Sequence, residues 1–162
     1  MDEIDAIYRR HAPAVFRFAW GLTGDRSRAE DIVSETFVRL LARPPKVATE
    51  TAVGYLLAIA RSVHVSGWRR RRREVDLPAG LRAEEPDPAL RLDERDELQR
   101  VLAELAQLPK GERAALLLRV DHDLSYEEIG SVLEISAVAA RVRVHRARVR
   151  LAGVRSSQGR SS

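Results

Sequence analysis

Apolar side chains recur at helical spacing through most of this 162-residue chain, and this period is the feature that most restricts its fold. Counted from Ala29, they occupy positions i, i+3, i+4, i+7, i+8, i+11 and i+12, which is the spacing of an amphipathic helix. No segment carries a convincing alternating pattern of a β-strand. We therefore expect an all-α fold.

The spacing predicts three helices in the first half of the chain and four in the second. They are expected at about residues 4–20, 27–41, 51–73, 93–107, 112–120, 125–133 and 137–151. Pro13 predicts a kink or a break in the first helix, because proline removes a backbone donor. Two capping boxes, Ser27 with Glu30 and Ser125 with Glu128, predict helix starts.

An acidic segment that contains three prolines separates the two groups of helices. Residues 74–97 hold nine acidic residues and three arginines, and no helical period survives around the prolines. We interpret the prolines and acids as a flexible linker between two small domains. Each domain would be marginally stable alone, because a domain this small buries only about 60% of its unfolded surface. The expected order is domain, linker, domain and disordered tail, at residues 1–73, 74–92, 93–152 and 153–162.

The chain lacks the residues that several classes of protein need. It contains no cysteine, which excludes a disulfide scaffold, thiolate zinc sites, iron–sulfur clusters and a catalytic thiol. The four histidines fall in different predicted elements, and no enzyme phosphate loop or serine elbow is present, so we expect no cofactor, no metal and no catalytic residue. No run of 18 apolar residues occurs and the first residues are acidic, so we expect a cytoplasmic protein without a membrane span.

Positive charge is concentrated at two places, although the net charge is only +4. Residues 69–73 are five consecutive arginines, and the chain from Ser136 onward has seven arginines and no acid. A short helix, a short connection and a basic helix form the pattern of a helix-turn-helix. Arg143, Arg146 and Arg150 would line one face of the basic helix, and guanidinium groups bind phosphate and guanine edges. We favour nucleic-acid binding over a merely solvated basic face.

Other surfaces carry more than one interpretation. Five arginines exceed what a helix dipole needs, so residues 69–73 favour a surface that follows phosphates, with Trp68 as a candidate for stacking on unpaired bases. Tyr55 lies on the apolar stripe and is expected in the core. The polar side of the second predicted helix is either a solvated face or a docking surface for a basic partner, and its residues are Glu30, Asp31, Ser34 and Glu35.

The motifs in both halves can be compared with a known family. Residues 28–40 (RAEDIVSETFVRL) resemble the core-binding helix of region 2 in bacterial sigma factors. Residues 55–62 (YLLAIARS), with residues 68–71, resemble the helix of that region that melts and reads the −10 element. In the second half, three stretches resemble sigma region 4: residues 108–119, 124–130 (LSYEEIG) and 144–148 (VHRAR). The order of the motifs resembles the extracytoplasmic-function (ECF) group of the sigma-70 family.

The resemblance covers about residues 5–151 and implies both a fold and a function. The implied fold is all-α: a region 2 bundle of three or four helices and a region 4 helix-turn-helix, joined by the flexible acidic linker. The implied function is that of a sigma factor, which directs core RNA polymerase to promoters and assists melting while the polymerase performs catalysis. The implied partners are the β′ clamp helices and β flap of core polymerase, promoter DNA and an anti-sigma factor.

Residue by residue, the resemblance implies three binding sets. The set for the polymerase clamp helices is Glu30, Asp31, Ser34, Glu35 and Arg39. The set for extruded bases of the −10 element, to which the loop at residues 44–50 also belongs, is Lys46, Arg61, Ser62, Val65, Trp68, Arg69, Arg70 and Arg71. The set for the major groove of the −35 element is Ser125, Tyr126, Ser136, Ala137, Ala139, Arg141, Val142, Arg143, His145 and Arg146.

This chain departs from the family pattern at several positions. Glu134 stands where the family commonly has glycine in the turn, and a positive φ there would cost roughly 1 kcal/mol or more. Ala139 and Val142 replace small hydroxyl residues, which leaves contacts to thymine methyl groups in place of hydrogen bonds. Ser62 and Ser66 stand where region 2 often has asparagine and aspartate. Phosphate affinity should survive these changes better than sequence specificity does.

Two alternatives belong to other functional classes. A DNA-binding regulator would use the same helix-turn-helix without recruiting polymerase, but it would not need the acidic docking face. A nucleic-acid-processing enzyme would cleave its substrate with a metal, and retention on core polymerase or metal-dependent cleavage would separate these functions. The apolar residues Val138, Val142 and Val149, expected to be exposed on the last helix, are candidates for the anti-sigma contact.

Overall fold

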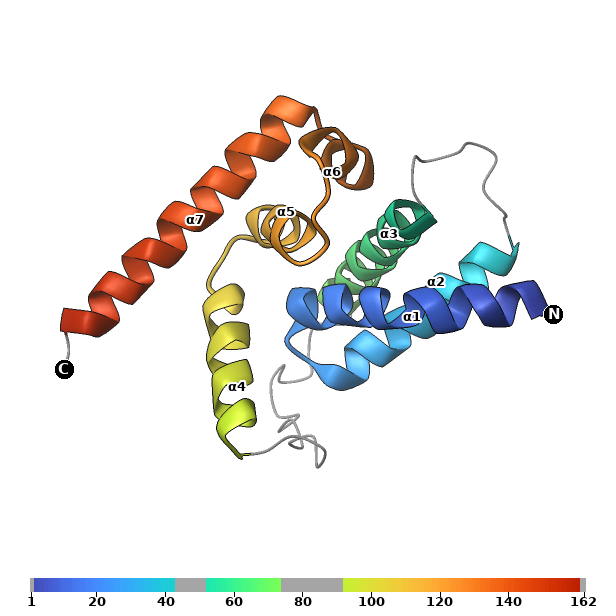
Figure 1. Cartoon of the computed structure of the whole chain (residues 1–162), viewed down its shortest axis with the longest axis horizontal. Coiled ribbons are helices and arrows are strands. Elements are labelled where there is room, and N and C mark those ends of the chain that lie inside the picture. Colours follow the sequence, from blue (N-terminus) through green and yellow to red (C-terminus); the bar gives the residue numbers. More distant parts are fainter. Residues whose placement is uncertain (1, 43–51, 74–91, 161–162) are drawn as a thin grey trace.

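The computed structural model describes residues 2–42, 52–73 and 92–160, and within these ranges the chain is helical without strands (Figure 1). The all-α prediction is therefore confirmed. The helices are α1 (Asp2–Thr23), α2 (Arg26–Ala42), α3 (Ala52–Arg73), α4 (Leu92–Ala106), α5 (Lys110–Val120), α6 (Tyr126–Leu133) and α7 (Ala137–Arg160). We refer to α1–α3 as the N-terminal group and to α4–α7 as the C-terminal group. The expected linker and the loop at residues 44–50 lie outside the described residues, apart from Leu92.

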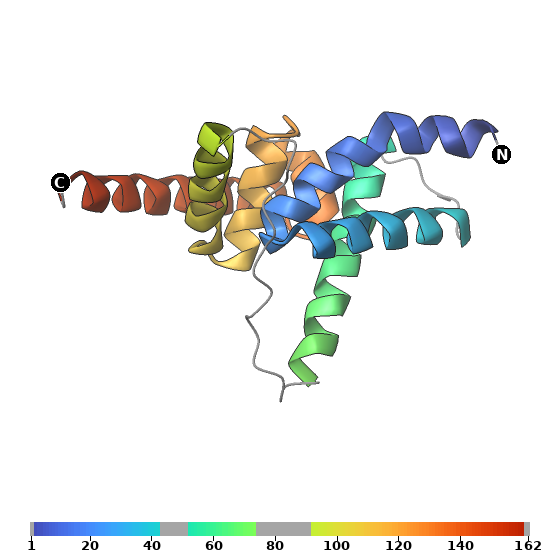
Figure 2. The same cartoon turned by 90° about the horizontal axis from the view of Figure 1, so that it is seen from below.

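Helix α1 is continuous across Pro13, so a break there was the wrong alternative. The helix bends partway along its length, as Figure 2 shows. Proline removes one backbone hydrogen bond, but the side chains on the core face continue beyond it and hold the helix together. Val15, Phe18 and Ala19 are fully buried in that face.

The N-cap of α2 lies two residues before the predicted capping residue Ser27. The cap is Asp25, whose Oδ1 accepts a hydrogen bond from the amide of Arg28 at 3.2 Å, whereas Ser27 is exposed inside the helix. The prediction of Ser27 as the cap was wrong because the preceding turn already supplies an aspartate. The hydroxyl of Thr23 holds that turn by accepting from the amide of Asp25 at 3.1 Å.

Helices α6 and α7 form the predicted helix-turn-helix, and both pack on α5. Ser125 caps α6 as expected, since its hydroxyl accepts from the amide of Glu128 at 3.1 Å. Glu134 ends α6 in the left-handed region, with φ 58° and ψ 45°. The turn also needs glycine at position 130, because a Cβ there would lie 2.6 Å from the carbonyl oxygen of Ile135. The expectation of a strained non-glycine residue in this turn is therefore confirmed.

Helix α7 is longer than the sequence predicts. It continues to Arg160, although we expected it to end at about Leu151 and the tail from residue 153 to be disordered. The helix crosses Gly153 and Gly159 because an isolated glycine costs about 1 kcal/mol in a helix and does not terminate it. No proline follows Leu151 to end the helix.

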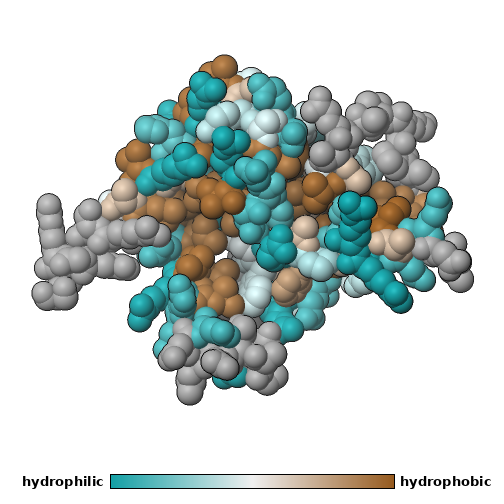
Figure 3. All heavy atoms as spheres, viewed as in Figure 1, coloured by the Kyte–Doolittle hydropathy of each residue, from teal (hydrophilic) through white to brown (hydrophobic). Residues whose placement is uncertain are grey.

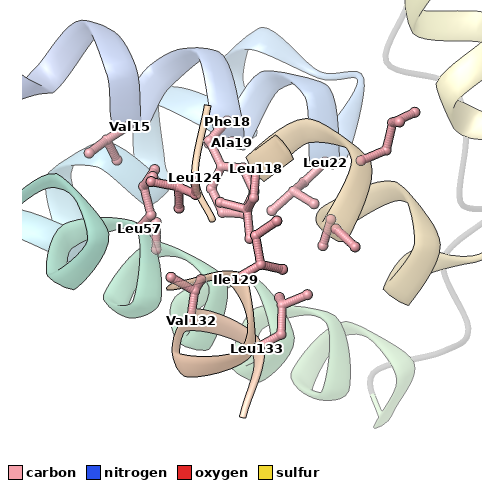
Figure 4. Packing of buried hydrophobic residues seen from close by; sticks show 14 of the residues in the cluster. Val15, Phe18, Ala19, Leu22, Leu57, Leu118, Leu124, Ile129, Val132 and Leu133 are labelled. Carbon is pink, nitrogen blue, oxygen red and sulfur yellow. The ribbon is translucent and has the colours of Figure 1, made fainter. Parts of the chain in front are cut away.

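The two groups of helices pack directly against each other. Helix α1 contacts α4 and α5, and α3 contacts α6. In the close view of the core, side chains from α1 and α3 meet side chains from α5, α6 and the segment before α6 (Figure 4). The labelled residues are Val15, Phe18, Ala19, Leu22, Leu57, Leu118, Leu124, Ile129, Val132 and Leu133. This shared core does not follow from the sequence, because an apolar helix face does not reveal which partner covers it.

Candidate nucleic-acid interface

Helix α3 presents the predicted −10 set on the sides that it does not bury. Its core face consists of Leu56, Leu57 and Ala60. Outside this face, Arg61, Val65 and Trp68 are half-buried, whereas Ser62, Arg69 and Arg70 are exposed. The side chain of Arg71 and all of Lys46 lie outside the described residues. The structure therefore brings six members of the predicted set together on one helix.

Tyr55 is only half-buried, so its prediction as a core residue was wrong. It borders a hollow of about 510 Å³ that Arg39, Ala58 and Ser62 also line. The adjacent Leu56 occupies the core position instead, at 1% exposure. The apolar stripe of α3 is thus rotated slightly from the one that the sequence suggests.

The C-terminal group covers part of the α3 surface. The ammonium of Lys110 lies 3.2 Å from the centre of the Trp68 ring. The guanidinium of Arg61 lies 3.8 Å from a carboxylate oxygen of Glu134, the residue that ends α6. Two of the candidate residues for the −10 element therefore contact the opposite half of the chain.

The predicted docking face of α2 is largely open. Glu30, Asp31, Ser34 and Glu35 are exposed, and Arg39 is half-buried. An ion pair of 3.2 Å joins Arg39 to Glu35 one turn away. A hollow of about 300 Å³ between α2 and α3 is lined by both acidic and basic side chains, among them Asp31, Glu35, Arg39 and Arg70. The acidic docking candidates and an arginine of the −10 set thus border one hollow.

Tyr126 has a role in the helix-turn-helix that the sequence does not show. Its half-buried ring lies between two cations, with the guanidinium carbon of Arg119 at 4.6 Å and that of Arg141 at 5.1 Å. Cation–π contacts of this kind are worth about 0.5–1 kcal/mol at exposed sites. Tyr126 therefore orients Arg141, an exposed member of the predicted −35 set.

Helix α7 buries Ala140, Val144 and Ala147 and exposes arginines and valines on its other sides. Its first turn is capped by Ser136, whose hydroxyl accepts from the amide of Ala139 at 3.0 Å. The −35 set is mostly accessible: Ser136, Arg141, Val142, His145 and Arg146 are exposed, and Ser125, Ala137, Ala139 and Arg143 are half-buried. Figure 3 shows hydrophilic side chains interspersed with hydrophobic ones along this helix.

The valines that we proposed for a protein contact are exposed as expected, at 73% for Val138, 40% for Val142 and 57% for Val149. Arg150, in contrast, is exposed but forms an ion pair. Its guanidinium lies 2.7 Å from a carboxylate oxygen of the buried Glu112. Because the two residues are far apart in sequence, their spacing gives no hint of this pair.

Two half-buried polar residues, Arg113 and His122, mark the junction of the two groups. Arg113 donates from Nη1 to the carbonyl oxygen of Leu22 at 2.8 Å and from Nη2 to those of Ala106 and Leu108. Burial lowers the pKa of the Arg113 guanidinium. His122 packs edge-on against Phe18, with ring centres 5.8 Å apart.

The His122 side chain is 3% exposed, and this burial lowers its pKa. The carboxylate of Asp121, 3.4 Å from Nε2, opposes the decrease, and Arg17 adds to it. Arg17 itself lies 3.3 Å from the same carboxylate. The junction therefore contains a histidine whose neutral form the fold favours.

Within the part of the chain that the structure describes, no three His, Asp or Glu side chains gather as metal ligands would. Nor does any helix in these ranges have the length and apolar character needed to cross a membrane.

Two family profiles match the chain, and together they cover both groups of helices. "Sigma-70 region 2" matches residues 7–74, and "Sigma-70, region 4" matches residues 98–151. The ECF RNA polymerase sigma factor EcfG of Rhodopseudomonas palustris is 31% identical over 147 residues, which are 88% of this chain and 79% of that protein. This chain belongs to the ECF group of the sigma-70 family. The region 2 match therefore covers most of α1 and all of α2 and α3. The region 4 match covers most of α4, all of α5 and α6, and α7 as far as Leu151.

Two further relatives extend the comparison. SigE of Mycolicibacterium smegmatis, an ECF RNA polymerase sigma factor, is 34% identical over 93% of this chain, which spans 61% of SigE. The sigma factor RpoE of Bartonella quintana, solved in complex with the anti-sigma factor NepR, superposes with a TM-score of 0.75 at 26% identity and covers 93% of this chain and 95% of that one. Sigma factors as a family are regulatory subunits rather than enzymes.

Proposed function

We propose that this sigma factor binds core RNA polymerase through α2 and places α3 on the −10 element and the helix-turn-helix on the −35 element of a promoter. The observation that carries the proposal is that one chain holds both region 2 and region 4, each with a helix that exposes arginines. A regulator that only bound duplex DNA would need the second region alone. The polymerase would perform all catalysis, in the cytoplasm where chromosomal DNA is transcribed.

The docking step is supported by the charge and exposure of α2. Glu30, Asp31 and Glu35 are exposed on the side of the helix opposite the buried Ile32, Val33 and Phe37. Arg39 pairs with Glu35 and so keeps that carboxylate at the surface. These side chains, together with Ser34, would contact the β′ clamp helices of the polymerase.

The melting step is supported by the composition of α3. Extruding a base costs a few kcal/mol of stacking, which contacts in a protein pocket offset. Trp68 offers an aromatic face, and the exposed Arg69 and Arg70 offer guanidinium groups to the phosphates of the separated strand. Ser62 provides an exposed hydroxyl one to two turns earlier. Lys46 and Arg71 would complete the set.

The −35 step is supported by the first turns of α7. In a helix-turn-helix, the N-terminal residues of the second helix contact base edges in the major groove. Here these residues are Ser136, Ala137, Ala139, Val142 and Arg143, with Arg141, His145 and Arg146 beside them for phosphates. The β flap of the polymerase would hold this region in place.

An anti-sigma factor is a further proposed partner. The solved RpoE relative is bound to one. The exposed valines 138, 142 and 149 of α7 give this chain an apolar surface for such a contact. Cross-linking to an anti-sigma protein that left this surface unprotected would contradict the assignment.

The decisive experiment combines retention on core polymerase with run-off transcription from a library of promoters. We expect the full chain to be retained and to direct specific transcripts. Glu35→Lys should weaken retention while leaving binding to duplex DNA unchanged, because α2 packs chiefly on α1 and α3 and not on the helix-turn-helix.

The matched control is Glu97→Lys, which reverses an exposed charge on α4 and should change neither property. Duplex binding without retention on the polymerase would instead indicate a DNA-binding regulator. Equal loss of both properties in Glu35→Lys would show that the substitution disrupts the fold.

A further inference from the structure

A cavity of about 200 Å³ lies between the two groups of helices, and five cationic residues line it together with apolar ones. Arg61 and Arg69 line it from α3, Lys110 and Arg113 from α5, and Arg143 from α7. Among the described residues, no aspartate or glutamate lines it. Five cationic side chains border one small, partly buried space, where screening by water is weak. Arg113 already donates to three backbone carbonyl oxygens, so it contributes its charge to the space more than its hydrogen bonds. This arrangement favours an anion in the cavity.

The cavity also adjoins the positive end of a helix. Lys110 and Gly111 are the first two residues of α5, and no side chain caps this terminus. The first amides of a helix have no partner within it, and the helix dipole places partial positive charge there. A helix N-terminus combined with convergent cations is an arrangement that binds phosphate groups.

The absence of a side chain on Gly111 keeps this end of the cavity open. A Cβ at position 111 would lie 2.8 Å from Nη1 of Arg143. The guanidinium of Arg143 therefore lies directly against the first turn of α5. Glu134 lies 3.8 Å from Arg61, but its side chain is 85% exposed. It reduces the positive charge at one edge only.

We propose that this cavity binds the phosphate groups of a small phosphate-bearing anion, such as pyrophosphate or the phosphate chain of a nucleotide. The volume fits a phosphate chain and is smaller than the roughly 300–1,000 Å³ typical of sites that enclose a drug-sized molecule. Because its ligands come from α3, α5 and α7, the anion binds only while the two groups are packed together. It therefore stabilises the packed arrangement.

The test is calorimetric titration of the full chain with pyrophosphate, in magnesium-free buffer at a fixed ionic strength of about 0.15 M. We expect saturable binding of one pyrophosphate per chain, and an increase in the midpoint of thermal unfolding. Lys110→Gln and Arg143→Gln should each weaken binding by about tenfold, since each removes a charge-assisted contact. Arg148→Gln, which removes an exposed arginine of α7 outside the cavity, should leave binding unchanged.

Two substitutions should act in opposite directions. Gly111→Asp places a carboxylate among the cations, and it should abolish pyrophosphate binding while raising the unfolding midpoint of the unliganded chain. Glu134→Gln removes the nearby carboxylate and should tighten pyrophosphate binding. The midpoints of all variants show whether each one is folded, so weak binding can be separated from misfolding.

Titration with ATP identifies the source of the phosphate. Tighter binding of ATP than of pyrophosphate would indicate a nucleotide, and equal affinity would indicate that only the phosphate chain is bound. The proposal is overturned if sulfate at the same ionic strength binds equally well, or if Arg148→Gln weakens binding as much as Lys110→Gln does. A chain that fails to direct transcription would still bind pyrophosphate, so this test is separate from that of the sigma-factor function.

Discussion

The basic surfaces of α3 and α7 carry the same kind of charge but differ in how accessible they are. On α3, Trp68 lies under Lys110 and Arg61 faces Glu134, so the C-terminal group covers part of the surface. On α7, Arg141, His145 and Arg146 are exposed. The packed chain thus exposes α7, the helix proposed to read duplex DNA, while it partly covers α3, the helix proposed to capture single-stranded DNA. The number of arginines on a helix therefore does not determine whether its surface is accessible to DNA.

The difference follows from where acidic residues lie relative to each helix. The chain from Ser136 onward, which includes α7, contains no acidic residue. Among the described residues, Arg150 is the only arginine of α7 with an ion pair, and its partner is Glu112 of α5. Arg61 of α3, in contrast, finds its acidic partner in the opposite group. Contact between the two groups of helices therefore reduces the accessibility of the basic surface of α3 more than that of α7.

The largest expected effect comes from Phe18→Ala. Phe18 is fully buried where the two groups share a core, and truncating such a residue costs about 3–5 kcal/mol. Because α1 contacts both groups, we expect one cooperative transition in urea for the wild type and for the variant, by circular dichroism and by tryptophan fluorescence. Val138→Ala, at an exposed site, should change the free energy of unfolding by less than about 0.5 kcal/mol. Two separate transitions in the wild type would show that the groups do not share a core.

Arg113→Ala should have the next largest effect. It removes the hydrogen bonds from the guanidinium to the carbonyl oxygens of Leu22, Ala106 and Leu108. A hydrogen bond that involves a charged group contributes about 1.5–3 kcal/mol to the free energy of unfolding. The substitution should also uncover α3, so the affinity for a labelled single-stranded oligonucleotide should increase in a fluorescence anisotropy assay. Arg113→Lys retains the charge but loses the planar guanidinium, so its stability and its affinity for the oligonucleotide should lie between those of the wild type and of Arg113→Ala. An unchanged affinity for single strands would show that packing does not limit access to α3.

Sequence periodicity and local motifs predict most of the helices and the helix-turn-helix, because these depend on residues close together in the chain. The left-handed Glu134 belongs to this class, since turn geometry is local. The cap of α2 was misplaced because Asp25 and Ser27 offer competing local signals. The end of α7 was misplaced because glycine only weakens a helix.

The candidate site could be predicted only in part, because several of its contacts join distant residues. The pair of Arg150 with Glu112, the stacking of Lys110 on Trp68 and the bond from Arg113 to Leu22 all depend on tertiary packing. Sequence assigns Arg143 and Arg150 to one phosphate-binding face, whereas packing directs both toward α5. A charged side chain can be identified from sequence, but its availability cannot.

Salt dependence distinguishes the arginines of α7 from one another. Each phosphate contact contributes about one unit to the slope of log affinity against log salt concentration. Arg146→Ala should therefore make the slope for duplex binding less negative by about one unit, because Arg146 is exposed. Arg143→Ala should change it less, since Arg143 is half-buried beside Gly111. Duplex binding measured by anisotropy between about 50 and 200 mM salt tests both, and an unchanged slope for Arg146→Ala would remove that residue from the phosphate contacts.

The smallest expected effect is the pH dependence that His122 gives to the junction. Burial lowers its pKa in the folded chain below the ordinary value of about 6.5, so the unfolded chain binds protons more readily. Stability should therefore be complete above about pH 6.5 and decrease as the pH falls toward the lower folded value. His122→Gln should reduce this loss, measured as the free energy of urea unfolding at pH 7.5 and pH 5.5. Asp121→Asn should increase it, because the carboxylate favours the protonated ring and Arg17 would then act unopposed. If Asp121→Asn instead reduced the loss, the titrating group would not be His122, and the histidine would not report on contact between α1 and the C-terminal group.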